Sequence, residues 1–437
     1  MKVLIRGARV LDPGEKIDGR FDLLLVDGLI AGIKPEIKIE AGLTIKADGL
    51  LVTPGFIDLH THLREPGGEH KETIQTGSQA AARGGFAVIC CMPNTRPVND
   101  RPEITREIIN RAKLVSPVRV LPIAAISREE KGQQLSPMAE LASAGAAGFS
   151  DDGQPVSNSA LMRQALEQAA SLDLPIIDHC EERSLAQNGL INEGRVSKLL
   201  KLTGLPAAAE EIMVARDIIL AKDLKLPVHL AHLSTRGSVE LLSWARAASV
   251  PVTAEVTPHH LLLTEEVLLT GNPDAKVNPP LRTEEDVQSL RQALKTGLID
   301  IIATDHAPHT EEEKKAGLEK APFGINGLEI ALPSLLDLLV KKQGFPLARV
   351  IEALSSGPAK LLKLRAGGRI KEGQRADLTI IDLEGKAVIT KETMASKSWN
   401  TPFLGSTFTG SIVMTIINGQ PVYQDKNYAN IWFDRSR

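Results

Sequence analysis

The chain has 437 residues, enough for one large domain with a small one or for two to three ordinary domains. Its 43% hydrophobic and 24% charged residues are typical of a globular enzyme, while a formal net charge of −3 and only 3% aromatic residues argue against nucleic acid or an anionic membrane as a partner. No apolar run approaches the roughly 20 residues of a membrane span, and the N-terminal apolar run is too short for a signal peptide. Three cysteines do not make a disulfide framework, so we expect a reducing, cytoplasmic location.

Both ends of the chain carry signals of antiparallel β-structure. In residues 1–51, short apolar runs such as Asp22-Leu-Leu-Leu-Val alternate with turn residues such as Asp12-Pro-Gly. The C-terminal part has the same pattern, with strands expected around Asp377-Leu-Thr-Ile-Ile and Gly410-Ser-Ile-Val-Met. We therefore expect residues 1–51 and 365–437 to form one small composite β-sandwich domain, with residues 52–364 inserted between its two parts.

The middle of the chain alternates predicted strands with predicted helices. Charged segments with helical periodicity, such as residues 207–221 and 284–294, separate apolar and often β-branched runs. This alternation predicts a parallel sheet, and eight units in about 300 residues fit a closed (β/α)8 barrel of the TIM type better than an open sheet. A Rossmann fold is disfavoured because no Gly-x-Gly-x-x-Gly lies between a strand and a helix. The eight runs are Val52–Leu59, Ala87–Cys91, Val118–Ile126, Ala146–Phe149, Pro175–Ile177, Pro227–Ala231, Val250–Val256 and Ile299–Ala303.

The predicted strands end in polar residues rich in histidine and aspartate. His60 and His62 end the first strand two residues apart, so their side chains face the same side. On its own, such a pair suits hydrogen-bonded core histidines as well as a metal site. A parallel barrel, however, brings its strand ends to one rim, and polar ends on seven strands favour a metal centre there. The other ends carry Asn94, Asp151-Asp152, Asp178-His179, His229-Leu-Ala-His232, His259-His260 with Asn278 beyond, and Asp305-His306 with His309.

These motifs together resemble those of the type I dihydroorotases, which belong to the amidohydrolase superfamily. The resemblance covers essentially the whole chain, and the set in this order is more specific than any single motif. It implies a zinc-dependent enzyme of pyrimidine biosynthesis that reversibly cyclises N-carbamoyl-L-aspartate to dihydroorotate. The matching stretches are Asp58-Leu-His-Thr-His-Leu-Arg-Glu-Pro-Gly, Met92-Pro-Asn-Thr, Gly148-Phe-Ser-Asp-Asp-Gly, Asp178-His-Cys-Glu, His229-Leu-Ala-His-Leu-Ser, Asn278-Pro-Pro-Leu-Arg and Ala303-Thr-Asp-His-Ala-Pro-His.

The resemblance implies one or two zinc ions per chain, with two favoured. Many amidohydrolases bridge their metals with a carboxylated lysine at the end of the fourth strand. This chain has no lysine there, and Asp152 takes the position with a shorter arm. The implied ligands are His60 and His62 for the first ion, His179 and His232 for the second, Asp152 as the bridge, and Asp305 as a further ligand of the first ion.

The expected chemistry needs an activated water and a proton carrier. A bound metal lowers the pKa of water from about 15.7 to about 7 and polarises the ring carbonyl. Asp305 would accept the proton of the attacking water and pass it to the departing ring nitrogen, with the reverse steps during cyclisation. The free carboxylate of the substrate calls for a guanidinium such as that of Arg64. The resemblance adds Asn94 and His309 at the carboxylate, and Asn278 with the backbone of Phe323 and Gly324 at the ring amides.

Several polar residues near the predicted site receive no assigned role. His229 lies three residues before His232, so on a regular strand it faces the opposite way and belongs to the core or to the surroundings of the ligands. The charged run after Thr310 is expected to start a helix capped by Thr310 and Glu313, and its position also allows it to be part of a mobile lid. The remaining candidates, which could orient ligands or lie at the site mouth, are Asp151, His259, His260, His306 and His70.

Two other functions are kept as alternatives. A hydantoinase or allantoinase would open a related ring, but such relatives usually carry the fourth-strand lysine and lack the Leu-Arg-Glu-Pro and Pro-Asn-Thr motifs. An inactive dihydroorotase-like partner of aspartate transcarbamoylase would typically lack the ligand histidines, which this chain has. The resemblance also implies a homodimer, and an active enzyme that docks on aspartate transcarbamoylase stays open.

Overall fold

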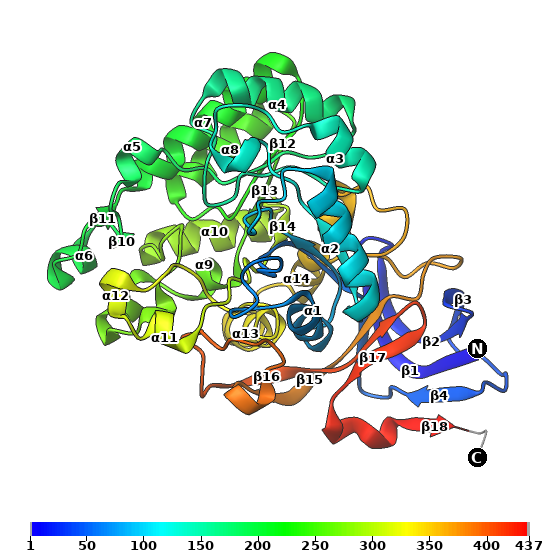
Figure 1. The fold of residues 1–437 in the computed structure, drawn as a ribbon. Helices are drawn as coiled ribbons and strands as arrows, with labels where there is room; N and C mark the ends of the chain where they lie inside the picture. Colours follow the sequence, from blue (N-terminus) through cyan, green and yellow to red (C-terminus); the bar gives the residue numbers. More distant parts are fainter. Residues whose placement is uncertain (1, 435–437) are drawn as a thin grey trace.

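One nine-stranded sheet joins the two ends of the chain in the computed structural model, which describes residues 2–434 (Figure 1). Its strands are β1 (Lys2–Asp12), β2 (Ile17–Val26), β3 (Leu29–Lys34), β4 (Leu43–Lys46), β5 (Leu51–Pro54), β15 (Leu378–Val388), β16 (Thr407–Ile417), β17 (Gln420–Gln424) and β18 (Trp432–Asp434). Their order is β17-β16-β15-β5-β1-β2-β3, and β4 pairs with both β1 and β18. The two ends meet directly, because β5 is antiparallel to β15 and β4 is antiparallel to β18.

Apolar side chains from both chain ends share one hydrophobic core. Ile5 and Val10 of β1 pack in the same fully buried cluster as Ile380 of β15 and Val413 of β16. Burial of these side chains away from water holds the two ends together. The pairing of the ends matches the expected composite arrangement, whereas its sandwich form and the boundaries after residues 51 and 364 stay predictions.

The first predicted barrel strand is two strands in the structure. β5 belongs to the nine-stranded sheet, while β6 (Phe56–Thr61) begins the barrel. Gly55 separates them: its N–H donates to the Asp377 carbonyl at 2.8 Å, and a Cβ there would lie 2.7 Å from the Ala87 Cβ. No side chain fits at this crossing, so the glycine allows one apolar run to serve both parts of the fold.

Seven parallel strands and one bridging residue form the barrel. The strands are β6, β7 (Phe86–Cys91), β8 (Arg119–Pro122), β9 (Ile177–Asp178), β12 (Val228–Leu230), β13 (Val252–Val256) and β14 (Ile301–Ile302). They pair in two groups, β6-β7-β8 and β14-β13-β12-β9. Phe149 joins the groups on one side through parallel bridges to Ala124 and Ile176, and Thr61 pairs with His306 on the other. The barrel is therefore closed, with the fourth predicted strand reduced to Phe149.

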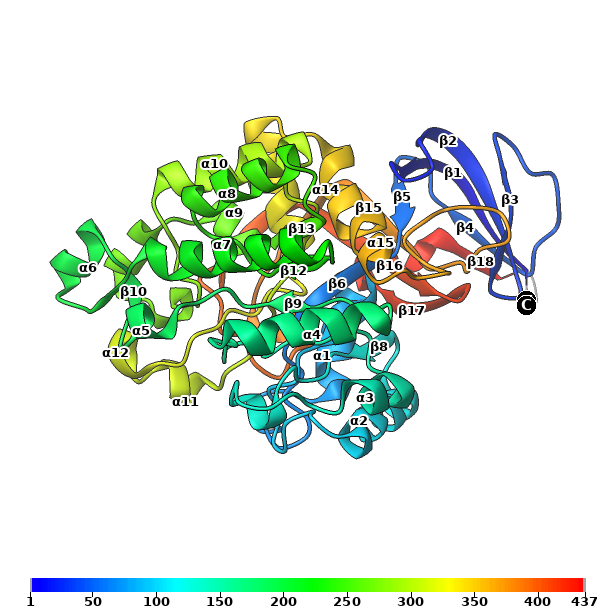
Figure 2. The same ribbon diagram turned by 90° about the horizontal axis from the view of Figure 1, so that it is seen from above.

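Helices cover the outside of the barrel, and the strands β1 to β4 extend beyond it to one side (Figure 2). The helices are α1 (Ile74–Arg83), α2 (Pro102–Val115), α3 (Met138–Ala144), α4 (Ser159–Ser171), α5 (Arg183–Ala186), α6 (Arg195–Leu200), α7 (Ala207–Leu224), α8 (Arg236–Ala247), α9 (Pro258–Leu262), α10 (Glu284–Thr296), α11 (Glu311–Lys314), α12 (Gly317–Lys320), α13 (Ala331–Ser334), α14 (Leu347–Leu354) and α15 (Ser356–Leu361). Shorter elements are β10 (Ile191–Asn192), β11 (Gly204–Leu205), a π-helical turn at Leu335–Lys341, and 3-10 turns at Arg128–Glu130, Glu265–Thr270, Pro273–Ala275, Lys391–Thr393 and Lys426–Ile431. The predicted cap of α11 is confirmed, because Thr310 and Glu313 exchange side-chain-to-backbone hydrogen bonds.

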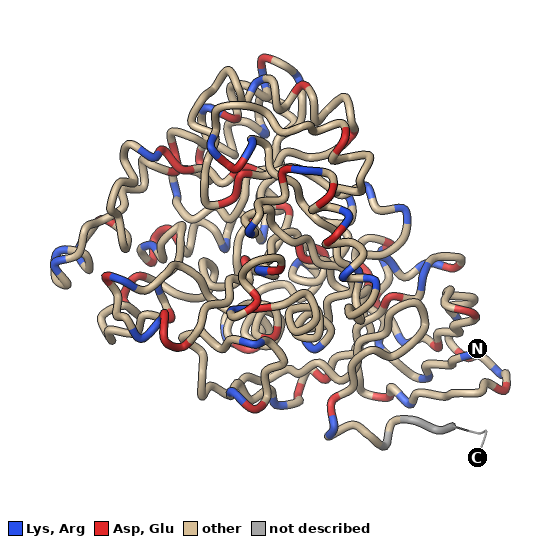
Figure 3. The backbone as a smooth tube through the Cα atoms, in the orientation of Figure 1, with Lys and Arg blue, Asp and Glu red and all other residues tan. Residues whose placement is uncertain are grey.

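Residues of both charge signs are spread along the whole chain. Lysine and arginine alternate with aspartate and glutamate along the backbone (Figure 3). Within residues 2–434, no helix combines the length and apolar character that a membrane crossing requires.

Candidate metal centre

The structure brings the predicted metal ligands together at the carboxyl ends of the barrel strands. Their ligand atoms form two groups, His60 with His62 and Asp305, and His60 with Asp152 and His232, each lying within 4.8 Å of one another. His179 joins them, with its Nδ1 2.9 Å from Nε2 of His232. All of these side chains are buried. Residues more than 240 positions apart thus converge because parallel strands end at one rim, as His62 and Asp305 do at 3.0 Å.

Asp152 lies at the centre of the four histidines. Its Oδ1 is 3.2 Å from His60 Nε2, 3.4 Å from His179 Nδ1 and 3.6 Å from His232 Nε2. Its Oδ2 is 3.4 Å from His62 Nε2. Oδ1 thus faces three of the histidines and Oδ2 faces the fourth, so the shorter aspartate arm reaches both histidine pairs, as a bridging ligand would.

The donor atoms fit a divalent cation. Nε2 of His60 and Oδ1 of Asp152 are buried and have no hydrogen-bond partner in the described part of the chain. Imidazole nitrogens and carboxylate oxygens are the ligands that zinc takes in proteins. Burial alone would raise the pKa of Asp152 and of Asp305, but the surrounding histidines outweigh it and hold both pKa values well below their usual range. Two ionised carboxylates in a buried site favour a bound cation.

Three of the fourteen non-glycine residues with positive φ in the described chain lie at this rim. Arg64, His232 and Asp305 have positive φ angles of 61°, 29° and 46°. Such angles are uncommon for residues other than glycine, and they occur where surrounding structure fixes a functional side chain. All three belong to stretches that the sequence motifs also single out.

Glu255, which sequence reasoning missed, orients His60. It is fully buried in β13, and its Oε1 lies 3.0 Å from His60 Nδ1. Its Oε2 lies 3.2 Å from His229 Nε2, so His229 has the supporting role expected of it. A carboxylate on Nδ1 holds the imidazole with Nε2 free for a metal. The only sequence signal was one charged residue within the apolar strand Val252–Val256.

Asn94 performs the same task for His62. Its Oδ1 accepts from His62 Nδ1 at 2.9 Å, and its Nδ2 donates to the backbone oxygen of Asp152 at 3.4 Å. Asn94 was expected at the substrate carboxylate. It lies beside the metal ligands and also lines the small cavity described next, so its substrate contact stays a prediction.

A basic cavity of about 270 Å³ lies beside the metal ligands. Arg64 lines it, and its guanidinium is 3.3 Å from His309 Nε2. Burial lowers the pKa of Arg64 to about 10, which keeps it charged near neutral pH. His309 Nε2 donates to the Phe323 carbonyl at 2.8 Å, and burial together with Arg64 lowers the pKa of His309 to about 2. The exposed His70 lies on the rim of the same cavity.

Asn278 lies on the opposite side of the metal ligands, toward His179. Its Nδ2 donates to Glu181 Oε2 at 2.8 Å, and its buried Oδ1 has no partner among the described residues. Gly324 has a φ of 145° and packs against the backbone of Ala307. A Cβ at this position would lie 2.6 Å from the Ala307 carbonyl oxygen, so no side chain fits there. Glu181 was quoted in a motif but given no role, although it contacts both Asn278 and the outer nitrogen of His179, the latter at 3.9 Å.

The candidates without an assigned role lie around the ligands. His306 is held by Glu72 at 3.3 Å, and Asp151 accepts from the Ser127 backbone at 3.0 Å. Both ring nitrogens of His260 have hydrogen-bond partners, namely the Thr257 hydroxyl at 2.8 Å and the Pro279 carbonyl at 3.0 Å. Only His259 keeps a buried nitrogen, Nε2, without a partner in the described residues. None of the four belongs to the metal-ligating groups of residues 2–434.

Comparison with known proteins identifies the family. A model described as "Dihydro-orotase-like" matches residues 49–238, and one described as "Amidohydrolase family" matches residues 210–423. A dihydroorotase from Acetivibrio thermocellus is 47% identical over 424 residues, which cover 97% of this chain and 99% of that relative. The chain belongs to the dihydroorotase family. A dihydroorotase from Syntrophus aciditrophicus is 45% identical over 97% of this chain and 100% of its own length.

Solved structures of related enzymes share the fold. An L-hydantoinase (dihydropyrimidinase) from Arthrobacter aurescens superposes with a TM-score of 0.88 at 26% identity, covering 97% of this chain and 96% of its own. A dihydropyrimidinase from Brevibacillus agri gives a TM-score of 0.83 at 22% identity, covering 98% of this chain and 96% of its own, and supports the fold alone. The solved structures confirm the predicted barrel, whereas the dihydroorotases at 45–47% identity confirm the predicted family, so neither alternative function is favoured.

Proposed function

We propose that this chain is a metal-dependent dihydroorotase that interconverts N-carbamoyl-L-aspartate with (S)-dihydroorotate and water in pyrimidine biosynthesis. The observation that carries the proposal is a complete set of metal-ligating side chains beside a partly buried, charged guanidinium, that of Arg64. The dihydroorotases at 45–47% identity support the same reaction.

We assign two zinc ions to each chain. Two groups of donors that share His60 support this number, because the second group contains Asp152, which also lies 3.4 Å from His179. His60, His62 and Asp305 would hold one ion, and His179 with His232 the other. When bound, zinc supplies a polarised carbonyl and a water whose pKa is lowered to about 7.

Asp305 carries the proton in the proposed reaction. Its Oδ1 is 3.0 Å from His62, and the histidines keep it ionised and ready to accept a proton. In ring opening, a C–O bond forms at the ring carbonyl carbon and the C–N bond breaks. The proton taken from water by Asp305 goes to the departing nitrogen, and cyclisation runs the same steps backward.

The basic cavity binds the carboxylate of the substrate. Arg64 would grip the free carboxylate with two parallel hydrogen bonds, because a guanidinium matches a carboxylate in shape and charge. Asn94 and the neutral His309 would add contacts there. Asn278, with its unpartnered Oδ1, and the backbone of Phe323 and Gly324 would bind the ring amide groups.

The test is ring opening by the purified, zinc-loaded protein, with dihydroorotate, hydantoin and allantoin as parallel substrates. We expect turnover of dihydroorotate to exceed that of the other two rings by orders of magnitude. A preference for hydantoin or allantoin would overturn the substrate, and failure to open any ring would overturn the activity.

A homodimer, docking on aspartate transcarbamoylase and a cytoplasmic location are further parts of the proposal, and they rest on the family resemblance. Size-exclusion chromatography of the chain alone tests the dimer. The same measurement with added aspartate transcarbamoylase tests the complex, since co-elution is expected if the two proteins dock.

A further inference from the structure

A second cavity, of about 710 Å³, opens at the end of the barrel opposite the metal centre, and we call it the lower cavity. It is lined by residues at the amino ends of the strands, such as Ile176 before β9, Val228 of β12 and Ile301 of β14. The metal ligands follow the carboxyl ends of the same strands. Its volume lies within the roughly 300–1,000 Å³ of small-molecule sites, and the reaction proposed above uses none of its lining residues.

One wall of this lower cavity is apolar. Leu174, Pro175, Pro227, Val228 and Leu361 line it together with Ile176 and Ile301. An apolar wall in a concave site gains free energy by covering the hydrocarbon part of a ligand.

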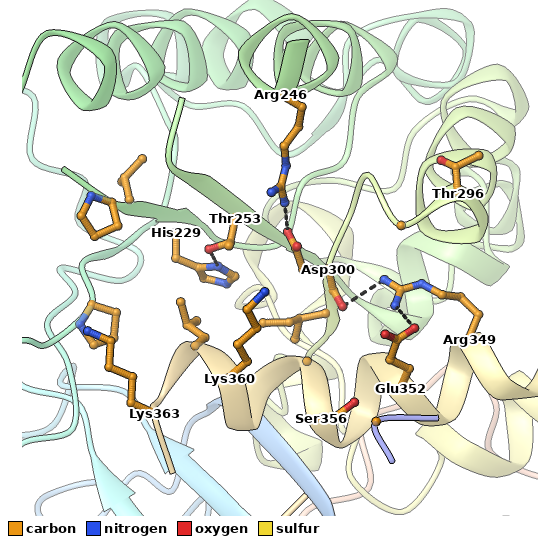
Figure 4. A pocket seen from close by; sticks show the side chains of 18 of the residues that line it. His229, Arg246, Thr253, Thr296, Asp300, Arg349, Glu352, Ser356, Lys360 and Lys363 are labelled. Atoms are coloured by element: carbon orange, nitrogen blue, oxygen red, sulfur yellow. Dashed lines mark hydrogen bonds and ion pairs between the residues drawn. The ribbon is translucent and has the colours of Figure 1, made fainter. Parts of the chain in front are cut away.

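The charged residues of the lower cavity are mostly basic. Six basic residues line it against two acidic ones, Asp300 and Glu352. Both acids are already paired: Arg246 donates to Asp300 at 2.5 Å, and Arg349 donates to Glu352 at 2.7 Å (Figure 4). No negative charge in the cavity is therefore left for the remaining cations.

Two of these cations are unpaired. The side chains of Lys295 and Lys360 have neither a hydrogen bond nor an ion pair to any residue in the described range 2–434. Figure 4 shows Lys360 reaching from α15 into the cavity, and Nε of Arg246 is buried there without a partner. Unpaired ammonium groups beside a low-dielectric wall attract an anion more strongly than they would in open water.

We infer that the lower cavity binds a small organic anion, with its apolar body against the strand ends and its acidic group at Lys295 and Lys360. An inorganic anion would leave the apolar wall uncovered, and a neutral aromatic compound would leave both ammonium groups unpaired. The floor of the cavity is His229, which contacts Thr253 at 2.8 Å and, through Glu255, the metal ligand His60. The site is thus separate from the metal centre but joined to it by two hydrogen bonds.

Calorimetric titration of the zinc-loaded full chain with naphthalene-1-sulfonate tests this inference. We expect saturable binding of one probe per chain. Sulfate and 1-naphthalenemethanol, which each supply half of the recognised chemistry, should bind at least about tenfold more weakly. Absence of saturable binding, or equal binding of either half-probe, would overturn the inference.

Variants locate the bound probe. Lys295→Glu combined with Lys360→Glu reverses both free charges at exposed positions, so the fold should persist, and the affinity should fall at least about tenfold. Lys113→Glu is the matched control, since Lys113 is an exposed lysine of α2 outside the cavity. Retention of affinity in the double variant would put the probe elsewhere, including at the metals. Zinc content and thermal unfolding measured on each variant identify any change caused by misfolding.

Discussion

Glu255→Gln is expected to weaken metal binding without removing a ligand. Glu255 is fully buried, and its two oxygens lie 3.0 Å from His60 Nδ1 and 3.2 Å from His229 Nε2. Burial alone would raise its pKa, but the hydrogen bonds from the two histidines lower it to about 2, so the carboxylate is ionised. Glutamine keeps the shape and one acceptor for His60 but removes the charge.

The size of this effect follows from the lost charge. A hydrogen bond to a charged partner contributes about 1.5–3 kcal/mol, against about 1 kcal/mol for a neutral one. A weaker hydrogen bond to His60 Nδ1 makes this imidazole a poorer metal ligand. Replacing a residue that hydrogen-bonds a metal ligand typically costs about 10–100-fold in metal affinity. Competition for zinc against a chelator of known affinity measures this directly.

The control for Glu255→Gln is Glu265→Gln. Glu265 is also buried, and it accepts one hydrogen bond from Asn192 at 2.8 Å without contacting a metal ligand. We expect the zinc affinity of Glu265→Gln to stay within about twofold of that of the parent protein, because the substitution alters only the contact with Asn192. If Glu255→Gln binds zinc as tightly as the parent protein, or if both variants lose the same zinc affinity, Glu255 does not orient His60 for the metal.

Three further predictions concern the site and the fold. Asp305→Asn should keep most of the zinc but lose about 10²–10⁴-fold in kcat; metal analysis beside turnover checks both, and normal turnover would remove Asp305 as the proton carrier. Arg64→Met should raise KM for dihydroorotate at least about tenfold with zinc content unchanged; an unaltered KM would take Arg64 out of the substrate site. Burial raises the pKa of Glu329 from 4.5 to about 7. The folded state therefore holds this proton more tightly, and the free energy of unfolding should fall as pH rises from about 4.5 to about 7, by up to about 3 kcal/mol. Denaturant unfolding across this range should give a flatter profile for Glu329→Gln, and identical profiles would contradict the assignment.

The ligand histidines could be predicted because their signal is local. His60 and His62 alternate at the end of an apolar run, and His179, His232 and Asp305 each follow another such run. Knowing that parallel strands end at one rim is enough to bring them together before any contact is seen.

The partners that hold the ligands could not be found in this way. Glu255 contacts His60 across 195 positions, and Glu181 contacts Asn278 across 97. Neither spacing recurs as a local pattern, and a single charged residue in an apolar strand is equally compatible with an edge strand. The same limit applies to Gly55, whose role depends on the approach of Ala87 and Asp377.

The sequence by itself determined the barrel, the family and the set of histidines and aspartates that converge at one rim, because hydrophobic periodicity and strand-end motifs are encoded within a few neighbouring residues. Tertiary structure alone decided which carboxylate orients which histidine, how Asp152 reaches all four histidines, and that the side chains of Lys295 and Lys360 find no partner among residues 2–434. These features depend on distances between segments far apart in the chain, and such distances are set by packing of the whole barrel.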